Sequence, residues 1–251
     1  MHTETYKNAP ITEATLDIRV RVPKAVTIES LENIRDEDYP KLKQRPMQMQ
    51  VRIVGQVENG KPIQQTAETI NTPLGFMFES ADQKQVFQVR TDGFTHNRLA
   101  PYQNWKSFSS EARRLWEKYK QVAGPEIIEL LGINYVNNIY VPAGTEYRTY
   151  LRTYLEVAPV LPQNLNTFFL NFQSTWPGDD EILLFVSQAV GPLVRPGFVT
   201  VVLNIRAFKT LQRPAADVDE EDMWSLFEKL REVKNAAFEG CITDRVRKEI
   251  R

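Results

Sequence analysis

Two halves of the chain align with each other at an offset of 119 residues (142 − 23 = 119), and this register constrains the fold more than any other feature. Pro23 aligns with Pro142, and each ends a stretch of alternating apolar residues. Three aromatic positions of a helical pattern agree at the same offset: Trp105 with Trp224, Phe108 with Phe227, and Tyr119 with Phe238. The offset is too long for a solenoid repeat, whose unit has roughly 20–50 residues. It predicts a duplicated unit of strand, helix, meander and helix; the alternative is coincidence among common residue types.

The first half begins with a strand, because Pro10–Pro23 alternates between apolar and polar residues and so has one wet face. Helical spacing predicts a helix within Thr27–Leu42, with Thr27 as its N-cap. Apolar residues at steps of three and four predict a long helix over Asn104–Ala123. Asn104 can cap its start, and Gly124 can end it in a left-handed conformation.

The stretch from Met47 to Leu99 predicts an antiparallel meander, because short alternating segments are separated by turn signals. Asn59–Gly60 and Asp92–Gly93 are the strongest of these signals. Strands are expected around Val51, Ile53 and Val57, and at Ile63–Ile70, Gly75–Glu79, Gln85–Arg90 and Phe94–Leu99.

The second half repeats this plan. Strands are expected at Gly132–Pro142, Asn166–Gln173, Glu181–Ala189 and Phe198–Lys209. Helices are expected at Glu146–Val157 and from about Glu221 to at least Glu239, where acidic residues at the start suit the helix dipole.

These elements predict an α+β fold with residues 1–124 as the first repeat and residues 125–251 as the second. Each half predicts an antiparallel sheet with one face exposed to solvent and a long helix on the other. Two such sheets most simply join into one curved sheet. Helices would cover its convex face, and polar strand residues would line its concave face. A duplicated unit of this order resembles the saddle architecture of the TATA-binding-protein-like fold, which is an analogy of fold and not of function.

Composition argues against several functional classes. The formal net charge of −1 gives the whole chain no attraction for nucleic acid or an anionic membrane. The single cysteine, Cys241, allows no intramolecular disulfide and fits a reducing compartment. No apolar run approaches the roughly 18 residues that span a bilayer, and the first ten residues do not have the shape of a signal peptide. We therefore expect a cytoplasmic protein without membrane association.

The sequence contains no motif that indicates a catalytic or cofactor-binding site. Two histidines and one cysteine argue against a zinc site, which needs three or four Cys, His or carboxylate ligands at defined spacing. A carboxylate-only magnesium site at Asp179, Asp180 and Glu181 is the alternative, but a solvated turn explains this acidic cluster more simply. The chain has no phosphate-binding Walker loop, no G-x-G-x-x-G and no G-x-S-x-G. We therefore expect no metal, no cofactor and no catalytic residue.

The candidate site lies at Arg90–Arg98, whose Asp–Gly turn and histidine have no match in the second half, together with the nearby Tyr102. Donor-rich side chains gather there near an aromatic ring, and we predict that they bind a ligand or partner: Arg90, His96, Asn97, Arg98 and Tyr102. The alternative is structural. Arg90 and Arg98 would then be outward strand residues paired with carboxylates, and His96 a hydrogen-bonded core residue.

Four segments resemble a sporadically distributed bacterial protein family of unknown function: NAPITEATLDIRV, VRTDGFTHNRLAPYQNWKSFSSEARRLWEKYKQVAGP, LGINYVNNIYVP and AFEGCITDRVR. The resemblance covers essentially the whole chain. It implies no catalytic residue or cofactor. The patchy distribution of that family is similar to that of accessory genes, including antiphage defence and toxin–antitoxin modules.

We therefore expect a non-catalytic binding or regulatory protein of a bacterial accessory system, which recognises a small ligand or a protein partner from the same operon. One alternative is an enzyme or nucleotide-binding module that uses His96 with Arg90 or Arg98. Another is nucleic-acid binding on the sheet face. Uncovered strand edges would allow a homodimer.

Overall fold

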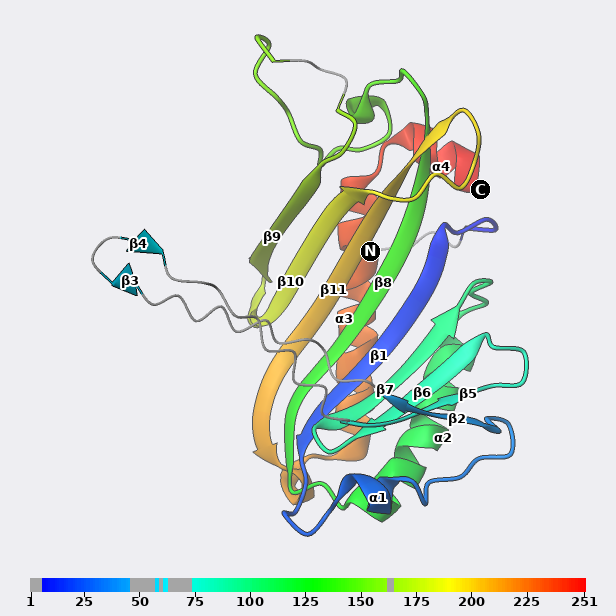
Figure 1. The fold of residues 1–251 in the computed structure, drawn as a ribbon, viewed down its shortest axis with the longest axis vertical. Helices are drawn as coiled ribbons and strands as arrows, with labels where there is room; N and C mark the ends of the chain where they lie inside the picture. The colour runs from blue at the N-terminus through cyan, green and yellow to red at the C-terminus, as the bar shows by residue number, and fades with distance from the viewer. Residues whose placement is uncertain (1–5, 46–56, 59–60, 63–73, 162–164) are drawn as a thin grey trace.

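The computed structural model describes residues 6–45, 57–58, 61–62, 74–161 and 165–251. Its strands and helices follow a similar order in the two halves of the chain (Figure 1). Up to Ala123 they are β1 (Ile11–Arg21), α1 (Ile28–Leu31), β2 (Lys41–Arg45), β3 (Val57–Glu58), β4 (Lys61–Pro62), β5 (Gly75–Glu79), β6 (Gln85–Arg90), β7 (Gly93–Leu99) and α2 (Trp105–Ala123). After it they are β8 (Ile127–Pro142), β9 (Phe169–Trp176), β10 (Asp179–Val190), β11 (Phe198–Pro214), α3 (Glu220–Cys241) and α4 (Asp244–Ile250), with single 3₁₀ turns at Tyr147–Thr149 and Ala215–Asp217.

Nine of the described strands form one antiparallel sheet in the order β2–β5–β6–β7–β1–β8–β11–β10–β9. β1 and β8 lie side by side at its middle. Moving outward from this pair, β7 is matched by β11, β6 by β10 and β5 by β9, whereas β2 has no counterpart beyond β9 in the described part of the chain. The prediction of an α+β protein with an antiparallel sheet is confirmed.

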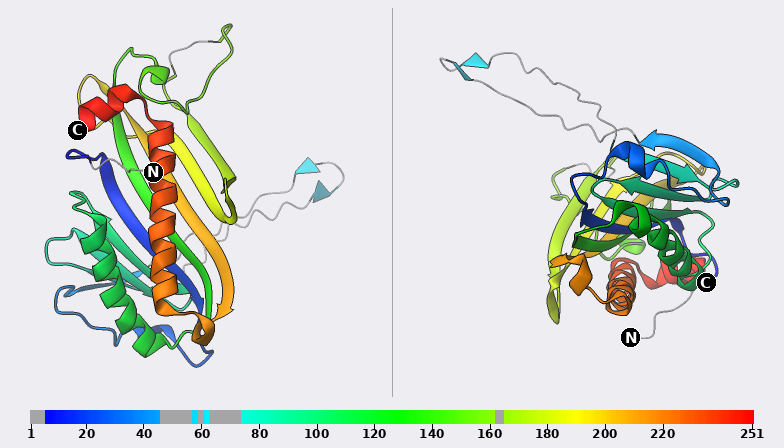
Figure 2. Two further views of the ribbon diagram at one scale, coloured as in Figure 1. Left: turned by 180° about the vertical axis from the view of Figure 1, so that it is seen from behind. Right: turned by 90° about the horizontal axis from the view of Figure 1, so that it is seen from below.

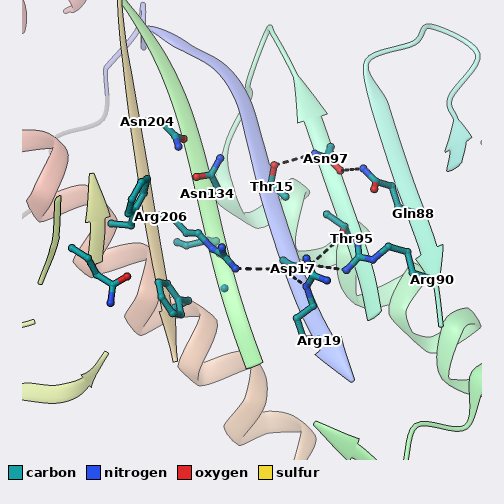
Figure 3. A pocket seen from close by; sticks show the side chains of 15 residues that line it. Thr15, Asp17, Arg19, Gln88, Arg90, Thr95, Asn97, Asn134, Asn204 and Arg206 are labelled. Atoms are coloured by element: carbon teal, nitrogen blue, oxygen red, sulfur yellow. Dashed lines mark hydrogen bonds and ion pairs between the residues drawn. The ribbon is translucent and has the colours of Figure 1, made fainter. Parts of the chain in front are cut away.

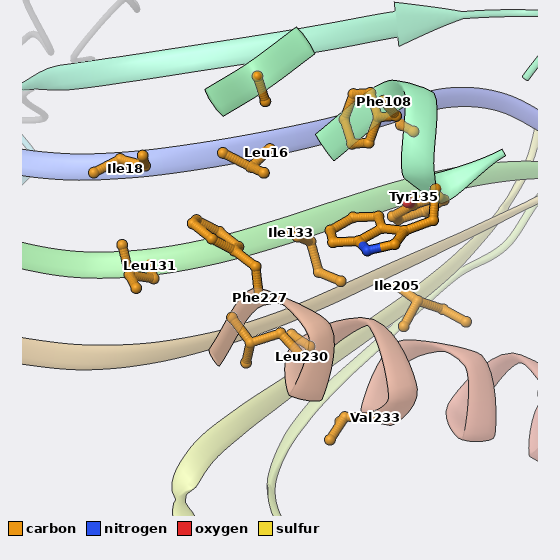
Figure 4. Close-up of a cluster of buried hydrophobic side chains, with 14 of the residues drawn as sticks. Leu16, Ile18, Phe108, Leu131, Ile133, Tyr135, Ile205, Phe227, Leu230 and Val233 are labelled. Atoms are coloured by element: carbon orange, nitrogen blue, oxygen red, sulfur yellow. The ribbon is translucent and has the colours of Figure 1, made fainter. Parts of the chain in front are cut away.

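The two long helices, α2 and α3, cover the same face of this sheet (Figure 2). Alternate apolar residues of the central strands point to that face, because successive side chains of a strand point to opposite sides. Figure 4 shows the resulting core, in which helix residues pack onto strand residues: Leu16, Ile18, Leu131, Ile133, Tyr135 and Ile205 from the sheet, and Phe108, Phe227, Leu230 and Val233 from the helices. None of the described helices is long and apolar enough to cross a lipid bilayer.

The ends of α2 follow the predicted chemistry. Asn104 Oδ1 accepts a hydrogen bond from the backbone N–H of Ser107 at 2.9 Å. Gly124 ends the helix with φ 50°, and its N–H donates to the carbonyl of Lys120. Both bonds satisfy backbone groups that a helix end leaves without an intrahelical partner. The helix predicted over Asn104–Ala123 is confirmed.

The helix predicted within Thr27–Leu42 is wrong beyond Leu31. Thr27 caps a single turn, after which Ile34 and Tyr39 turn into the core. Asp36 fixes this turn through ion pairs with two residues of α2, Arg114 at 2.5 Å and Lys118 at 2.9 Å. Pro40 then precedes β2, which pairs with β5. The apolar spacing thus came from a folded loop and not from a helix.

The helix predicted over Glu146–Val157 is also wrong, because only the 3₁₀ turn at Tyr147–Thr149 forms. Leu151 instead makes a β-bridge to Ile242, and the N–H of Thr243 donates to the carbonyl of Tyr150. The backbone carbonyl of Tyr150 therefore accepts its hydrogen bond from the C-terminal segment, and not from a later residue of a helix.

Some predictions fall outside the described residues. These are the turn at Asn59–Gly60, the strand at Ile63–Ile70, and the alternation at Val51 and Ile53. β3 and β4, which flank Asn59–Gly60, pair with each other.

Candidate ligand-binding site

A hollow of about 420 Å³ lies on the sheet face opposite α2 and α3, which we call the open face (Figure 3). Small-molecule sites commonly have volumes of about 300–1,000 Å³. The lining comes from seven adjacent strands and is mostly polar: Gln88, Arg90, Thr95, Asn97, Thr15, Asp17, Arg19, Gly132, Ile133, Asn134, Asn204, Arg206, Phe208, Phe185 and Gln173.

Strand register explains why these residues meet. One row across the sheet reads Gln173, Phe185, Arg206, Asn134, Thr15 and Asn97 from β9 to β7. The next row reads Phe208, Gly132, Asp17, Thr95 and Gln88 from β11 to β6. Residues directly opposite one another on an antiparallel pair point to the same face. Both halves of the chain therefore contribute to one surface.

Gly132 leaves the floor of the hollow without a side chain. A Cβ atom at this position would lie 3.2 Å from the Cβ of Phe208. Arg206 extends alongside this bare floor, with Nη2 3.6 Å from Asp17 Oδ2. Its guanidinium carbon also lies 4.8 Å from the centre of the Phe208 ring, within the range of a cation–π contact.

Asp17 is the centre of a charged network. Arg90 Nη2 donates to Asp17 Oδ1 at 3.1 Å, and Arg19 Nε donates to Asp17 Oδ2 at 3.1 Å. The same two arginines bind Asp92 from either side, each at 2.7 Å. Although burial opposes ionisation, Arg90 and Arg19 hold the pKa of the Asp17 carboxyl below its ordinary value. Asp17 therefore stays negative and keeps the arginines in place.

The network carries a surplus positive charge at Arg206. Three guanidinium groups, those of Arg19, Arg90 and Arg206, share the carboxylates of Asp17 and Asp92. Arg90 is saturated, since its third donor group binds Thr95 Oγ1 and its side chain is only 2% exposed. Arg19 and Arg206 are equally exposed, at 38% and 37% of their side chains, but Arg19 bonds to both carboxylates, whereas Arg206 has one longer contact, to Asp17. Arg206 is therefore the cation most available to a ligand.

Amide groups supply the neutral part of the lining. Asn97 Nδ2 donates to Glu13 Oε1 at 2.6 Å and to Thr15 Oγ1 at 3.0 Å, and Gln88 Nε2 donates to Asn97 Oδ1 at 3.3 Å. Gln88 Oε1 and Asn204 Oδ1 are buried oxygens with no hydrogen-bond donor among the described residues. Buried acceptors of this kind usually have a partner, so the amides of Gln88 and Asn204 have hydrogen-bonding capacity that the described residues do not use.

The five residues predicted from the sequence lie on two faces of the sheet. Arg90 and Asn97 line the hollow on the open face. His96 lies in the core on the helix face, where its ring stacks on Phe108 at 5.2 Å. Burial lowers the pKa of His96 to about 4, so the ring is neutral at pH 7. The predicted residues do not form one cluster.

Arg98 and Tyr102 lie on the helix face, near the start of α2. They line a smaller hollow of about 200 Å³ together with Asn104, Ser107 and other residues. The Tyr102 hydroxyl is 3.1 Å from that of Tyr135, so it has a hydrogen-bond partner within the protein.

Sequence reasoning missed most of the open-face residues: Thr15, Asp17, Arg19, Asn134, Asn204, Arg206, Phe185 and Phe208. The alternation along β1 and β8 did carry a signal, since it separated polar from apolar positions in each strand. It could not show that β1 lies between β7 and β8, or that β8 lies beside β11.

No group of three or more potential metal-binding side chains occurs among the described residues. A scan against protein-family models gives no match, and a comparison with curated proteins gives none either.

Proposed function

We propose that the protein is a non-catalytic binding protein that recognises a small anionic ligand on the open face. The observation that carries this proposal is the polar hollow at Gly132, bordered by Arg206 and reached by side chains from both halves of the chain. A hollow of this size fits a small molecule better than it fits the flat surface of a macromolecule.

The lining indicates the chemistry of the ligand. Arg206 suits a carboxylate or phosphate, because a guanidinium group can bind either with two parallel hydrogen bonds. Gln88 Oε1 and Asn204 Oδ1 suit N–H or O–H donors. Phe185 and Phe208 offer apolar surface for a flat ring. A nucleoside monophosphate combines all three features and is the simplest probe.

Isothermal titration calorimetry with nucleoside 5′-monophosphates and the matching nucleosides tests this proposal. We expect the monophosphates to bind more tightly, and Arg206→Ala to weaken their binding by about 10–100-fold, as expected for a lost charged hydrogen bond of roughly 1.5–3 kcal/mol. Arg213→Ala is the matched control, because Arg213 is an exposed residue of β11 outside the hollow. Equal binding by Arg206→Ala and the wild type would refute the assignment.

A protein partner on the same face is the competing form of this proposal. We infer the accessory-system context, including antiphage defence and toxin–antitoxin modules, from the family resemblance alone. Affinity capture with the products of neighbouring genes tests it. A partner that binds the wild type and Arg206→Ala equally would place the contact elsewhere on the molecule.

The enzyme alternative has less support. Arg90 lies on the open face, and His96 is 0% exposed in the core, so His96 cannot contact a ligand together with either Arg90 or Arg98 in this structure. Nucleic-acid binding has less support as well, because Glu13, Asp17 and Glu129 alternate with the arginines of the open face. A phosphate-binding track would show a steep fall of affinity with salt.

We also propose that residues 1–124 and 125–251 are copies of one ancestral unit, fused into a saddle like that of the TATA-binding-protein-like fold. The strand order supports this proposal, since it is symmetric about β1 and β8 except for β2. The helices agree, because Trp105 begins α2 and its 119-residue equivalent, Trp224, lies in the first turns of α3.

A further inference from the structure

The outer edge of β9 has no strand beside it in the part of the chain that the structure describes. The N–H of Val190 donates to the carbonyl of Phe168, just before β9, and that of Gly191, just after β10, donates to the carbonyl of Thr200 in β11. Alternate residues of an antiparallel strand bond to the same neighbour. The backbone groups of Phe169, Asn171, Gln173 and Thr175 therefore point away from β10.

Nothing in the sequence of β9 protects this edge. Its eight residues, FLNFQSTW, include no charged residue and no proline, and the irregularity in its pairing with β10 is confined to the Thr175–Trp176 end. Phe169 is 66% exposed and Phe172 is 37% exposed. Edge strands of monomeric proteins are usually protected by charges, prolines or bulges, because unpaired backbone groups attract another strand. The opposite edge fits this rule, since β2 has the sequence KLKQR with three basic residues.

The order of the sheet shows what is missing beside β9. In the first half, β2 lies outside β5, whereas in the second half no described strand lies outside β9, the counterpart of β5. A strand from another molecule would complete the symmetry of the sheet.

We propose that β9 pairs antiparallel with β9 of a second copy of this chain. One register pairs every outward-facing residue of both strands. It places Asn171 opposite the partner's Gln173 and Phe169 opposite the partner's Thr175, which gives about eight backbone hydrogen bonds. The same register places Phe172 opposite the partner's Phe172 at the two-fold axis, where facing aromatic side chains stabilise a sheet.

The pairing also extends the proposed ligand-binding surface. Gln173 borders the hollow on the open face and would lie next to the two-fold axis. The open faces of the two copies would then form one surface with a hollow on each side of the axis. The dimer itself does not depend on the identity of the ligand.

Light scattering after size exclusion tests the pairing with the full-length chain. We expect a mass of about 58 kDa (2 × 29.0) for the wild type and of 29.0 kDa for Phe172→Lys and Phe172→Glu separately, because each variant places like charges face to face at the axis. Mixing the two variants should restore the dimer. A wild type that stays at 29.0 kDa at high concentration, or that forms larger polymers, would overturn the proposal.

Two proline variants separate loss of pairing from loss of folding. Gln173→Pro removes a backbone N–H that points away from β10, so the fold should persist while the dimer is lost. Gln44→Pro is the matched control, because Gln44 holds an equivalent outward position on β2 at the other edge. We expect Gln44→Pro to remain a dimer. A dimer in Gln173→Pro, or a monomer in Gln44→Pro, would contradict pairing through β9.

Discussion

His96 should make the protein sensitive to mild acid, because its ring is fully buried and neutral. It is 0% exposed and stacks on Phe108, and burial lowers its pKa to about 4 from the ordinary value of 6.5. Between pH 6.5 and pH 4, His96 is therefore mainly protonated in the unfolded chain and mainly neutral in the folded protein. Stability falls as the pH drops from 6.5 towards 4, and the loss is complete below 4.

The size of the effect follows from the two pKa values. At pH 5 the histidine of the unfolded chain lies 1.5 units below its pKa, and each unit corresponds to about 1.4 kcal/mol, so the loss is about 2 kcal/mol. Carboxylates contribute little in this range, because their unfolded pKa values lie near 4.

Urea denaturation at pH 7.5 and pH 5.0 measures this loss. Between pH 7.5 and pH 5.0, the free energy of unfolding of the wild type should fall by about 2 kcal/mol more than that of His96→Phe, in which an apolar ring occupies the same site. The other histidine of the chain, His2, provides the control, and His2→Gln should keep the wild-type response. An equal response of the wild type and His96→Phe would show that His96 is not a buried neutral residue.

Two further substitutions test the packing of the fold. Lys234 is buried with its Nζ 3.9 Å from the centre of the Tyr135 ring, and burial, with help from Arg231, lowers its pKa to about 7. Stability should therefore rise as the pH increases from about 7 to 10.5, by up to about 5 kcal/mol, and Lys234→Met should abolish this rise in urea titrations. Gly93→Ala should cost about 2–3 kcal/mol, because its Cβ would lie 2.4 Å from the carbonyl oxygen of Ile18. Gly124→Ala should cost only about 1 kcal/mol, since only its left-handed backbone opposes a side chain there; equal denaturation midpoints for the two variants would contradict this account.

Local patterns in the sequence predicted those elements whose own residues decide their structure. The strand in Pro10–Pro23 and the helix over Asn104–Ala123 have complete periodicity and clear ends, and both form where expected. The predictions for Thr27–Leu42 and Glu146–Val157 failed, because contacts far along the chain decide these segments. Arg114 contacts the first of these segments and Ile242 the second, and the spacing of apolar residues within a segment carries no information about such distant contacts.

The candidate site was predictable in part for the same reason. Successive side chains of a strand point to opposite faces, so the sequence of Phe94–Leu99 is sufficient to place Thr95 and Asn97 on the face opposite His96, where the structure has them. The side chains that complete the hollow come from strands brought together by sheet order, such as Asp17 from β1 and Arg206 from β11. The predicted cluster lies on two faces because Asn97 directly follows His96 and so points to the opposite side, and because the strand register pairs His96 with Phe87 and not with Arg90.

The most direct test of the proposed binding site is to map where a nucleoside monophosphate perturbs the nuclear magnetic resonance spectrum of the protein. The side-chain amide signals of Asn134, Asn204 and Gln88 report on the open face, and the backbone signals of Arg98 and Tyr102 report on the smaller hollow at α2. We predict saturable shifts in the first group and none in the second, with the shifts lost in Arg206→Ala. Shifts confined to the second group, or no shifts at saturating ligand, would contradict the account.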